Sequence, residues 1–237
     1  MCEAIILKEP ENPTFRNEVK HYINRADYMT IRQRMQAVAR PDSHAGADGL
    51  YHIRSLYFDN IYDKAMQEKQ QGLAKREKFR LRFYNGNTDF IKLEKKTKVN
   101  GVGYKASAKV TAEQCERLIK GDISWMPESG NALIVELYAK MKSYGLKPKT
   151  IVDYIREPFI YEPGNVRVTL DSQIRTGIQC IDFLNPDVPT VRTSLYETII
   201  MEVKWDEMLP DIIRQAVQLP GRKSAAFSKY VACRMFG

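Results

Sequence analysis

The chain has 237 residues, of which 43% are hydrophobic and 28% charged, so its apolar content suffices for one compact folded unit. The 37 lysines and arginines exceed the 29 aspartates and glutamates, and the formal net charge is +8. Such a charge favours a polyanionic partner: nucleic acid, an acidic membrane surface or a phosphate compound. No internal repeat, low-complexity tract or linker divides the sequence. We therefore expect a single domain over residues 1–237.

Nothing near the N-terminus resembles a signal peptide, and no apolar run approaches the length that crosses a bilayer. We therefore expect a cytoplasmic protein. The four cysteines lie far apart with no Cys-x-x-Cys pair, which disfavours a zinc site or a disulfide framework. We expect reduced, mostly buried thiols at Cys2, Cys115, Cys180 and Cys233.

The N-terminal part of the chain predicts two strands, each followed by a helix. A strand is expected over residues 15–23 and a helix over 25–39. A polar loop over 40–49 leads to a second strand over 51–59, which is bounded by turn-forming residues. A short helix over 60–71 then ends before a glycine.

A β-hairpin is the clearest local prediction. Strands over 76–85 and 88–96 are joined by an Asn-Gly step, which favours a tight turn. Strict alternation in the first strand places Arg80 and Arg82 on one face and aromatic or aliphatic residues on the other. The basic stretch 97–105 contains two glycines and has two interpretations, a mobile phosphate-contacting loop or a plain solvated turn.

Two helices come next. Thr111 and Gln114 form a capping box for a helix that ends near Gly121, and a second helix is expected over 130–144. The C-terminal part then predicts a strand interrupted at Pro158, two further strands, a loop and two helices. Their ranges are 151–156 with 159–161, 166–171, 197–204, the loop 182–196, and the helices 209–218 and 223–235.

Charged and aliphatic residues alternate in several of these strands, notably in 91–94, 166–171 and 199–204. For any single strand the alternative is an ordinary half-buried sheet with its charges in bulk water. Across several strands, polar faces rich in arginine and lysine suit an anion lining. We therefore predict an α+β fold: a closed antiparallel β-barrel with a polar, charged interior, covered outside by helices.

Seven motifs, in order along nearly the whole chain, resemble the polyphosphate polymerase domain of the vacuolar transporter chaperone (VTC) family in its bacterial stand-alone form. They are Arg16-x-Glu18-x-Lys20-His21-Tyr22, Arg54-Ser55-Leu56-Tyr57-Phe58-Asp59, Arg76-Glu77-Lys78-Phe79-Arg80-Leu81-Arg82, Lys92-Leu93-Glu94-Lys95-Lys96, Tyr154-x-Arg156-Glu157-Pro158-Phe159, Glu202-Val203-Lys204 and Phe227-Ser228-Lys229-Tyr230. That family belongs to the triphosphate tunnel metalloenzymes, whose fold is an antiparallel barrel with a charged tunnel. The resemblance implies an enzyme that polymerises inorganic polyphosphate from the terminal phosphate of ATP and releases ADP.

Residue roles follow from the same resemblance. Six catalytic cations would hold the triphosphate and the growing chain: Lys20, Arg80, Arg82, Lys92, Arg156 and Lys229. Further substrate contacts would come from Arg54, Tyr154, Ser228, Glu18 and Glu94. Glu202 would bind the divalent metal, Mn²⁺ or Mg²⁺, since one hard carboxylate with phosphate oxygens and water suits either ion.

Several of these residues have a second interpretation. Glu18 could instead pair with Arg16 or with an arginine of a neighbouring strand, and Glu94 could equally be an ion-pair partner. Without the resemblance, Ser228 and Lys229 would be an exposed helix face. The three histidines are interpreted as structural, and Arg222 and Lys223 as solvated surface.

Two other functions remain open. Tunnel triphosphatases and class IV-type adenylate cyclases typically open with Glu-x-Glu-x-Lys, whereas Arg16 replaces the first glutamate here, which favours retaining a polymer over hydrolysis. A non-catalytic polyphosphate or polyanion-binding module is the second alternative. The expected partners are ATP and polyphosphate. Nucleic acid is not expected because no aromatic stacking platform interleaves with the basic residues, and any export would need a separate membrane protein.

Overall fold

The computed structural model describes residues 16–100 and 102–235, and its centre is one antiparallel sheet with the strand order β1-β10-β8-β7-β3-β4-β5-β6. The strands are β1 Asn17–Ile23, β2 Arg40–Pro41, β3 Tyr51–Asp59, β4 Lys75–Tyr84, β5 Asn87–Val99, β6 Val102–Val110, β7 Lys147–Tyr161, β8 Val166–Thr176, β9 Val191–Arg192 and β10 Ile199–Trp205. The helices are α1 Arg25–Val38, α2 Lys64–Gln70, α3 Ala112–Ile119, α4 Ala132–Tyr144, α5 Asp211–Val217 and α6 Lys229–Arg234.

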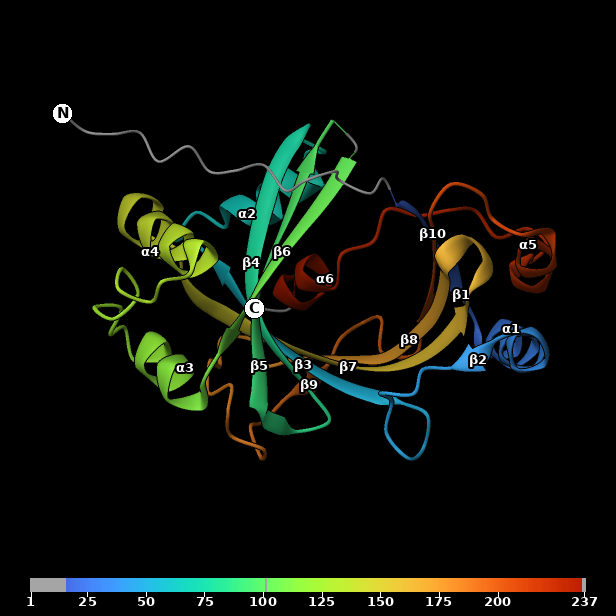
Figure 1. Cartoon of the computed structure of the whole chain (residues 1–237), viewed down its shortest axis with the longest axis horizontal. Helices are drawn as coiled ribbons and strands as arrows, with labels where there is room; N and C mark the ends of the chain where they lie inside the picture. Colours follow the sequence, from blue (N-terminus) through green and yellow to red (C-terminus); the bar gives the residue numbers. More distant parts are fainter. Residues whose placement is uncertain (1–15, 101, 236–237) are drawn as a thin grey trace.

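The sheet curls around an inner face (Figure 1). The sequence predicts a closed barrel, but β1 and β6 stand at the two ends of the strand order, and no ladder joins them in the described part of the chain. The described sheet is therefore a half-barrel. Short strands extend it at the side, with β2 paired to β7 and β9 paired to β8.

Helices cover the outer face in two groups, as the apolar side of the alternating strands requires (Figure 1). Phe79 and Leu93 pack with Leu137 of α4 and with α3 in one buried cluster. Val203 of β10 packs with Ile31 of α1 and with α5 in the other. Burying each such side chain contributes about 1.5–3 kcal/mol, so these two clusters hold the curled sheet.

Helix α6 lies on the inner face, between the two arms of the curled sheet (Figure 1). Tyr230 is 1% exposed and packs with residues of β3, β7 and β10. Its ring stacks on that of Tyr57, with the centroids 5.0 Å apart. This helix therefore fills part of the half-barrel and brings the C-terminal segment beside the sheet's polar residues.

Local capping signals place the helices. The expected capping box of Thr111 with Gln114 begins α3, and an equivalent box of Asn24 with Asp27 begins α1. The expected helix over 130–144 is α4, which ends at Gly145 with φ +65°, a conformation that favours glycine. The expected helix over 60–71 begins later, at Lys64, because the side chains of Asp59 and Asn60 accept N–H groups of the turn and of the first helical residues.

The prediction of a loop over 97–105 is wrong for most of its length. Strand β5 continues to Val99 and β6 begins at Val102, so these residues form a second hairpin. Asn100 adopts φ +50° at the turn, and its N–H donates to the carbonyl of Ala74. Asparagine tolerates this left-handed conformation, which lets the strands reverse within the basic stretch.

Two other expected boundaries are also corrected. Pro158 does not interrupt β7. The pairing of β7 with β3 ends at Arg156 and its pairing with β2 begins at Phe159, so Pro158 lies between the two ladders, where no N–H is needed on that side. The expected helix over 223–235 begins only at Lys229. Before it, Ser224 bridges to His21 and the N–H of Ala225 donates to the carbonyl of Lys20, so this segment satisfies the edge of β1 instead.

Other expectations concern location and thiols. No helix among the described residues is long and apolar enough to cross a membrane. Cys115 and Cys233 are buried free thiols, and Cys180 is partly buried. Cys2 and the first residue of the strand predicted over 15–23 lie outside the described residues.

Candidate functional site

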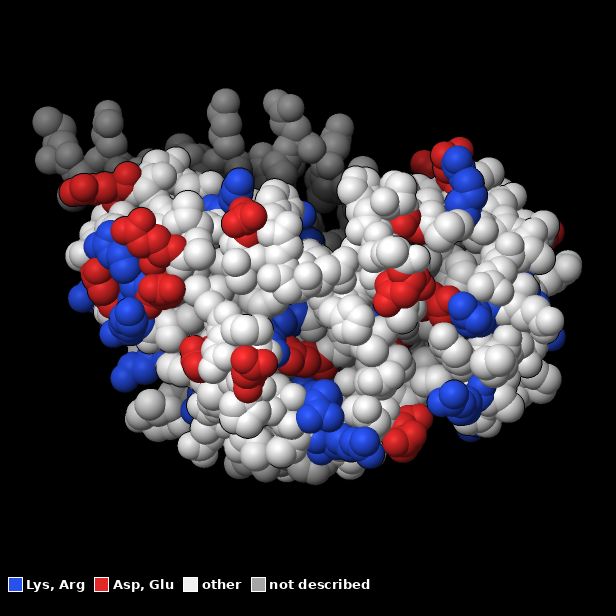
Figure 2. All heavy atoms as spheres, turned by 90° about the horizontal axis from the view of Figure 1, so that it is seen from below, with Lys and Arg blue, Asp and Glu red and all other residues white. Residues whose placement is uncertain are grey.

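Charged residues of the alternating strands gather on the inner face of the half-barrel. Cross-strand register places cations directly opposite carboxylates in three ladders: Arg80 opposite Glu94, Lys20 opposite Glu202, and Arg156 opposite Asp171. Directly opposed, oppositely charged residues are a favourable cross-strand pair. The face of the molecule seen from below also carries charges of both signs, which lie among neutral residues (Figure 2). We name the inner residues Lys20, Arg80, Arg82, Arg156, Lys229, Glu18, Glu94, Asp171 and Glu202 the central cluster.

Glu94 organises the arginines of β4. Its carboxyl is 2% exposed and accepts from Arg80 Nε at 2.7 Å, with Arg82 Nη1 at 3.9 Å and Lys105 also paired to it. Burial acts to raise the pKa of Glu94, but these three cations lower it well below its usual range. Glu94 is therefore an ionised partner that fixes the guanidinium groups.

Both arginines also donate to other side chains of the sheet. Arg82 is 4% exposed and donates to Ser55 Oγ at 2.9 Å and to Tyr154 Oη at 3.2 Å. Arg80 donates to Tyr57 Oη at 2.7 Å. Burial acts to raise the pKa of Tyr57, yet the nearby cations, Arg80 foremost, lower it to about 7. The arginine forks are thus held in fixed orientations, as bidentate phosphate binding requires.

Asp171 orients the cations of β7 and α6 in the same way as Glu94 orients the arginines of β4. It is fully buried and accepts from Arg156 Nε at 2.7 Å and Nη2 at 2.8 Å, and from Lys229 Nζ at 2.5 Å. Burial opposes its ionisation, but Arg156 and Lys229 lower the pKa of Asp171 to about 2. The Lys229 ammonium also lies 4.5 Å from the centroid of the Tyr154 ring.

Ser228 explains why Lys229 reaches the inner face. Its Oγ accepts from the N–H of Val231, so it caps α6, as serine commonly does. The cap fixes Lys229 as the first helical residue, and its side chain is only 10% exposed. The exposed helix face that sequence alone suggests for this pair is therefore not what the structure has.

Two carboxylates meet where β1 joins β10. Glu18 and Glu202 both contact Lys20 and Lys204, with Lys204 Nζ 2.5 Å from Glu202 and 3.7 Å from Glu18. Lys96 also pairs with Glu18, at 3.3 Å. Burial and the Glu202 carboxylate act to raise the pKa of Glu18, but the three lysines lower it to about 2. Glu18 therefore pairs with lysines, while Arg16 lies 3.5 Å from Asp206.

The donor set fits a hard divalent cation held partly by substrate. Within residues 16–100 and 102–235 no group of three His, Cys, Asp or Glu side chains converges, so an all-protein cage is absent there. Mg²⁺ and Mn²⁺ take one or two carboxylates together with phosphate oxygens and water. Glu202, with Glu18 beside it, meets that requirement.

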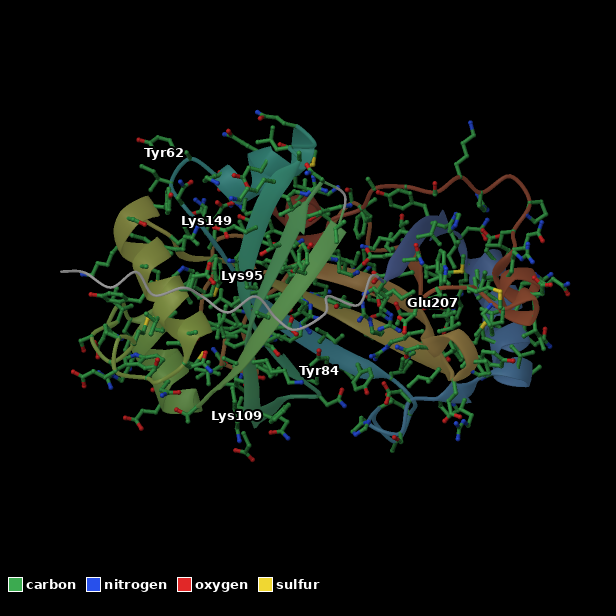
Figure 3. All side chains as sticks on the ribbon, turned by 45° about the horizontal axis from the view of Figure 1, so that its top comes forward. Tyr62, Tyr84, Lys95, Lys109, Lys149 and Glu207 are labelled. Atoms are coloured by element: carbon green, nitrogen blue, oxygen red, sulfur yellow. The ribbon has the colours of Figure 1, made fainter. Side chains whose placement is uncertain are left out.

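Two of the expected site residues lie elsewhere. Lys92 stands opposite Arg82 at the end of the hairpin, where its ammonium lies 4.8 Å from the Phe90 ring centroid near Lys109. Figure 3 labels Tyr84 and Lys109 at this end of the sheet, whereas Tyr62 lies near α2 at the other end.

Arg54 is the second expected site residue that lies outside the central cluster. It points to the outer face with Leu56, and its guanidinium binds Asp153 at 3.0–3.2 Å and the carbonyl of Asn185. Its position in the sequence motif therefore reflects an ion pair behind the sheet, and the phosphate contact implied by the resemblance is not supported.

Sequence reasoning missed several residues of the inner face: Tyr57, Lys78, Asp171, Lys105 and Lys69. Asp171 occupies an inner position of a strand whose alternation was visible, so that period was a sufficient signal. Tyr57 contacts Arg80 because the two lie opposite each other in the β3–β4 ladder. The burial of Tyr57 beneath Tyr230 had no signal in the sequence, because α6 brings these two residues together.

The fold and site thus form an antiparallel half-barrel with fixed cations, carboxylates and a capped helix on its inner face. The family model described as "VTC domain" matches residues 15–236, and the chain belongs to the VTC domain family. Among curated proteins there is no match.

Solved structures give distant likenesses. The PH1819 protein from Pyrococcus horikoshii OT3 is 13% identical, with 86% of this chain and 84% of that chain covered and a TM-score of 0.41. A putative adenylate cyclase from Bacillus halodurans is 10% identical, with 84% and 83% covered and a TM-score of 0.44. Family membership rests on the domain match alone.

Proposed function

We propose that this protein is a polyphosphate polymerase that transfers the terminal phosphate of ATP to a growing polyphosphate chain and releases ADP. The observation that carries this proposal is the central cluster, in which buried carboxylates hold Arg80, Arg82, Arg156 and Lys229 on the inner face of the half-barrel. Membership of the VTC domain family supports it. In this proposal the half-barrel is the wall of a tunnel that is closed during turnover.

The chain's own residues would work mainly by positioning and charge. Phosphoryl transfer spreads negative charge over equatorial oxygens, so fixed cations supply most of the stabilisation. Arg80 and Arg82 would grip oxygens in pairs, and Lys20 and Lys229 would act as point charges. A divalent metal held by Glu202 would neutralise phosphate charge when bound. Because Glu94 and Asp171 already fix the arginines, little reorganisation is needed as charge develops.

A tunnel triphosphatase is the second candidate, and one observation favours it. Glu18 and Glu202 approach the same two lysines, so two carboxylates are available beside the phosphates despite the substitution at Arg16. Two such carboxylates could hold a metal that activates water.

Product analysis separates these candidates. Purified protein is incubated with ATP and Mn²⁺ or Mg²⁺, products are resolved by gel electrophoresis, and ADP and orthophosphate are assayed in parallel. A ladder of polyphosphate with matching ADP supports the polymerase. Orthophosphate without polymer supports the triphosphatase. Binding of polyphosphate without turnover of ATP supports a non-catalytic module and contradicts the proposal.

A further inference from the structure

A second group of cations lies outside the central cluster, around a cavity of about 380 Å³. The cavity opens between β1 and the β4–β5 hairpin, beside α2 and the segment 224–228. Five of its cations belong neither to the central cluster nor to the roles that the family resemblance implies. Lys96 pairs with Glu18, and we name the other four the lysine-rich mouth: Lys69, Arg76, Lys78 and Lys98.

Carboxylates do not compensate the lysine-rich mouth. Glu77, one of the two acidic residues at the cavity, pairs with Lys95 and Lys140. Glu18, the other, pairs with lysines of the central region and with Lys96. Within the described residues no ion pair reaches Lys69, Lys78 or Lys98, and Arg76 donates to the carbonyl of Leu73 at 2.8 Å. All four side chains are half-buried.

The hairpin register sets these like charges against each other. Arg76 lies directly opposite Lys98, and Lys78 directly opposite Lys96. Directly opposed like charges destabilise a strand pair. The same arrangement occurs once more on this hairpin, where Arg82 lies opposite Lys92. Repulsion of this kind is relieved when an anion lies between the cations.

Titration behaviour agrees with this geometry. Burial, followed by the charge of Arg76 and other nearby cations, lowers the pKa of Lys69. Burial also lowers the pKa of Lys78 to about 8, with Tyr57 acting in the opposite direction and Arg80 adding to the decrease. Both ammonium groups are therefore destabilised in the absence of a counter-charge.

We propose that the lysine-rich mouth is a second anion subsite, which binds phosphates of a polyphosphate chain beyond those held by the central cluster. The inference rests on the proposed function and extends it to the polymer. Arg76 lies four positions before Arg80 on β4, about 13 Å along the strand, so the two subsites take different parts of one extended chain. The bordering ring of Tyr230 is buried and stacks on Tyr57, so it offers no open face on which a nucleic-acid base could stack.

Equilibrium binding of two probes tests this subsite without requiring catalysis. Inorganic tripolyphosphate and long-chain polyphosphate are titrated against the wild-type protein and a Lys69→Ala/Lys98→Ala variant at several salt concentrations. The matched control is Lys120→Ala/Lys142→Ala, which removes the same charge from exposed positions at the ends of α3 and α4. Thermal melting checks that each variant is folded.

The mouth variant should bind long-chain polyphosphate about tenfold more weakly, and its salt dependence should lose about one unit of slope per deleted contact. Its affinity for tripolyphosphate should match that of the control. An unchanged long-chain affinity, or an equal loss for both probes, overturns the second subsite. Failure of the proposed function is read separately, as absence of polyphosphate synthesis from ATP by the wild-type protein.

Discussion

The central cluster and the lysine-rich mouth share strands β4 and β5, but the cations of the first are paired with carboxylates and those of the second are not. In the central cluster each wall contains a carboxylate: Glu94 beside the arginines of β4, Asp171 beside Arg156, and Glu202 beside Lys20. In the mouth, Arg76 faces Lys98 with no carboxylate between them. Paired charges therefore fix the geometry of the central cluster before a ligand binds. The unpaired cations of the mouth are neutralised only when an anionic ligand is bound.

Removal of a central arginine should have the largest effect. For Arg82→Ala we expect polyphosphate synthesis to fall by about 100-fold to 1000-fold, because a preorganised donor to the transferring phosphate is lost. Initial rates of ADP release and polymer formation measure this. The matched control is Arg54→Ala, whose side chain binds Asp153 on the outer face and should leave the rate unchanged. Substantial unfolding of Arg82→Ala would count against its role in lining the site.

Neutralising the buried acid of the central cluster should have the next largest effect, this time on stability. Asp171→Asn leaves Arg156 and Lys229 without their carboxylate, and breaking a buried pair in this way costs about 3–5 kcal/mol of the free energy of unfolding. Urea denaturation measures the change. Glu116→Gln, which breaks the exposed pair with Lys120, is the control and should be close to wild type. A similarly small loss of unfolding free energy for Asp171→Asn would show that the ion pairs of Asp171 do not stabilise the packing of α6 against β7.

Converting the mouth to the central pattern should have a smaller effect of opposite sign. Lys98→Glu places a carboxylate opposite Arg76, so we expect the free energy of unfolding to rise by about 0.2–1 kcal/mol. The same variant should bind long-chain polyphosphate more weakly. Denaturation and titration are measured on one preparation, with Lys142→Glu as the control for charge reversal elsewhere. Destabilisation by Lys98→Glu would contradict the repulsion inferred for the mouth.

The smallest expected effect is a pH dependence of the free energy of unfolding that comes from Lys78 of the lysine-rich mouth. Lys78 faces Tyr57 on β3, Arg80 on β4, Lys96 on β5 and Lys20 on β1. Its pKa of about 8 in the folded chain lies below the usual 10.5, so the unfolded chain binds more protons above pH 8. The contribution of Lys78 to the free energy of unfolding should therefore rise between about pH 8 and 10.5.

Binding should follow the opposite trend. Long-chain polyphosphate interacts with the protonated ammonium, so its affinity should fall as pH rises through 8, as measured by titration between pH 7 and 9. Lys78→Met removes the titrating group, and this variant should lose that step in affinity while keeping other pH effects. An identical pH profile in wild type and variant would exclude Lys78 as its source.

Local patterns allowed much of the fold to be predicted. Alternation identified β4, β5 and β8 and the faces of Arg80 and Arg82, because side chains of a strand point to opposite sides with a period of two. Capping residues identified α3, and a glycine in the left-handed conformation marked the end of α4, because helix termini must satisfy free backbone groups locally. The turn at Asn100 was mistaken for a longer loop, since glycine-bearing basic sequence does not reveal strand pairing.

What the sequence determined by itself was therefore the polar face of each strand and the set of cations on it, both properties of neighbouring residues. The tertiary structure decided which charges meet. Asp171 contacts Lys229, 58 positions later in the chain, only because α6 packs on the inner face. Arg54 lies outside the central cluster because it is on the outer face, where it binds Asp153. Whether a cation is compensated depends on register and curvature, so the difference between the central cluster and the lysine-rich mouth appears only when the sheet has curled.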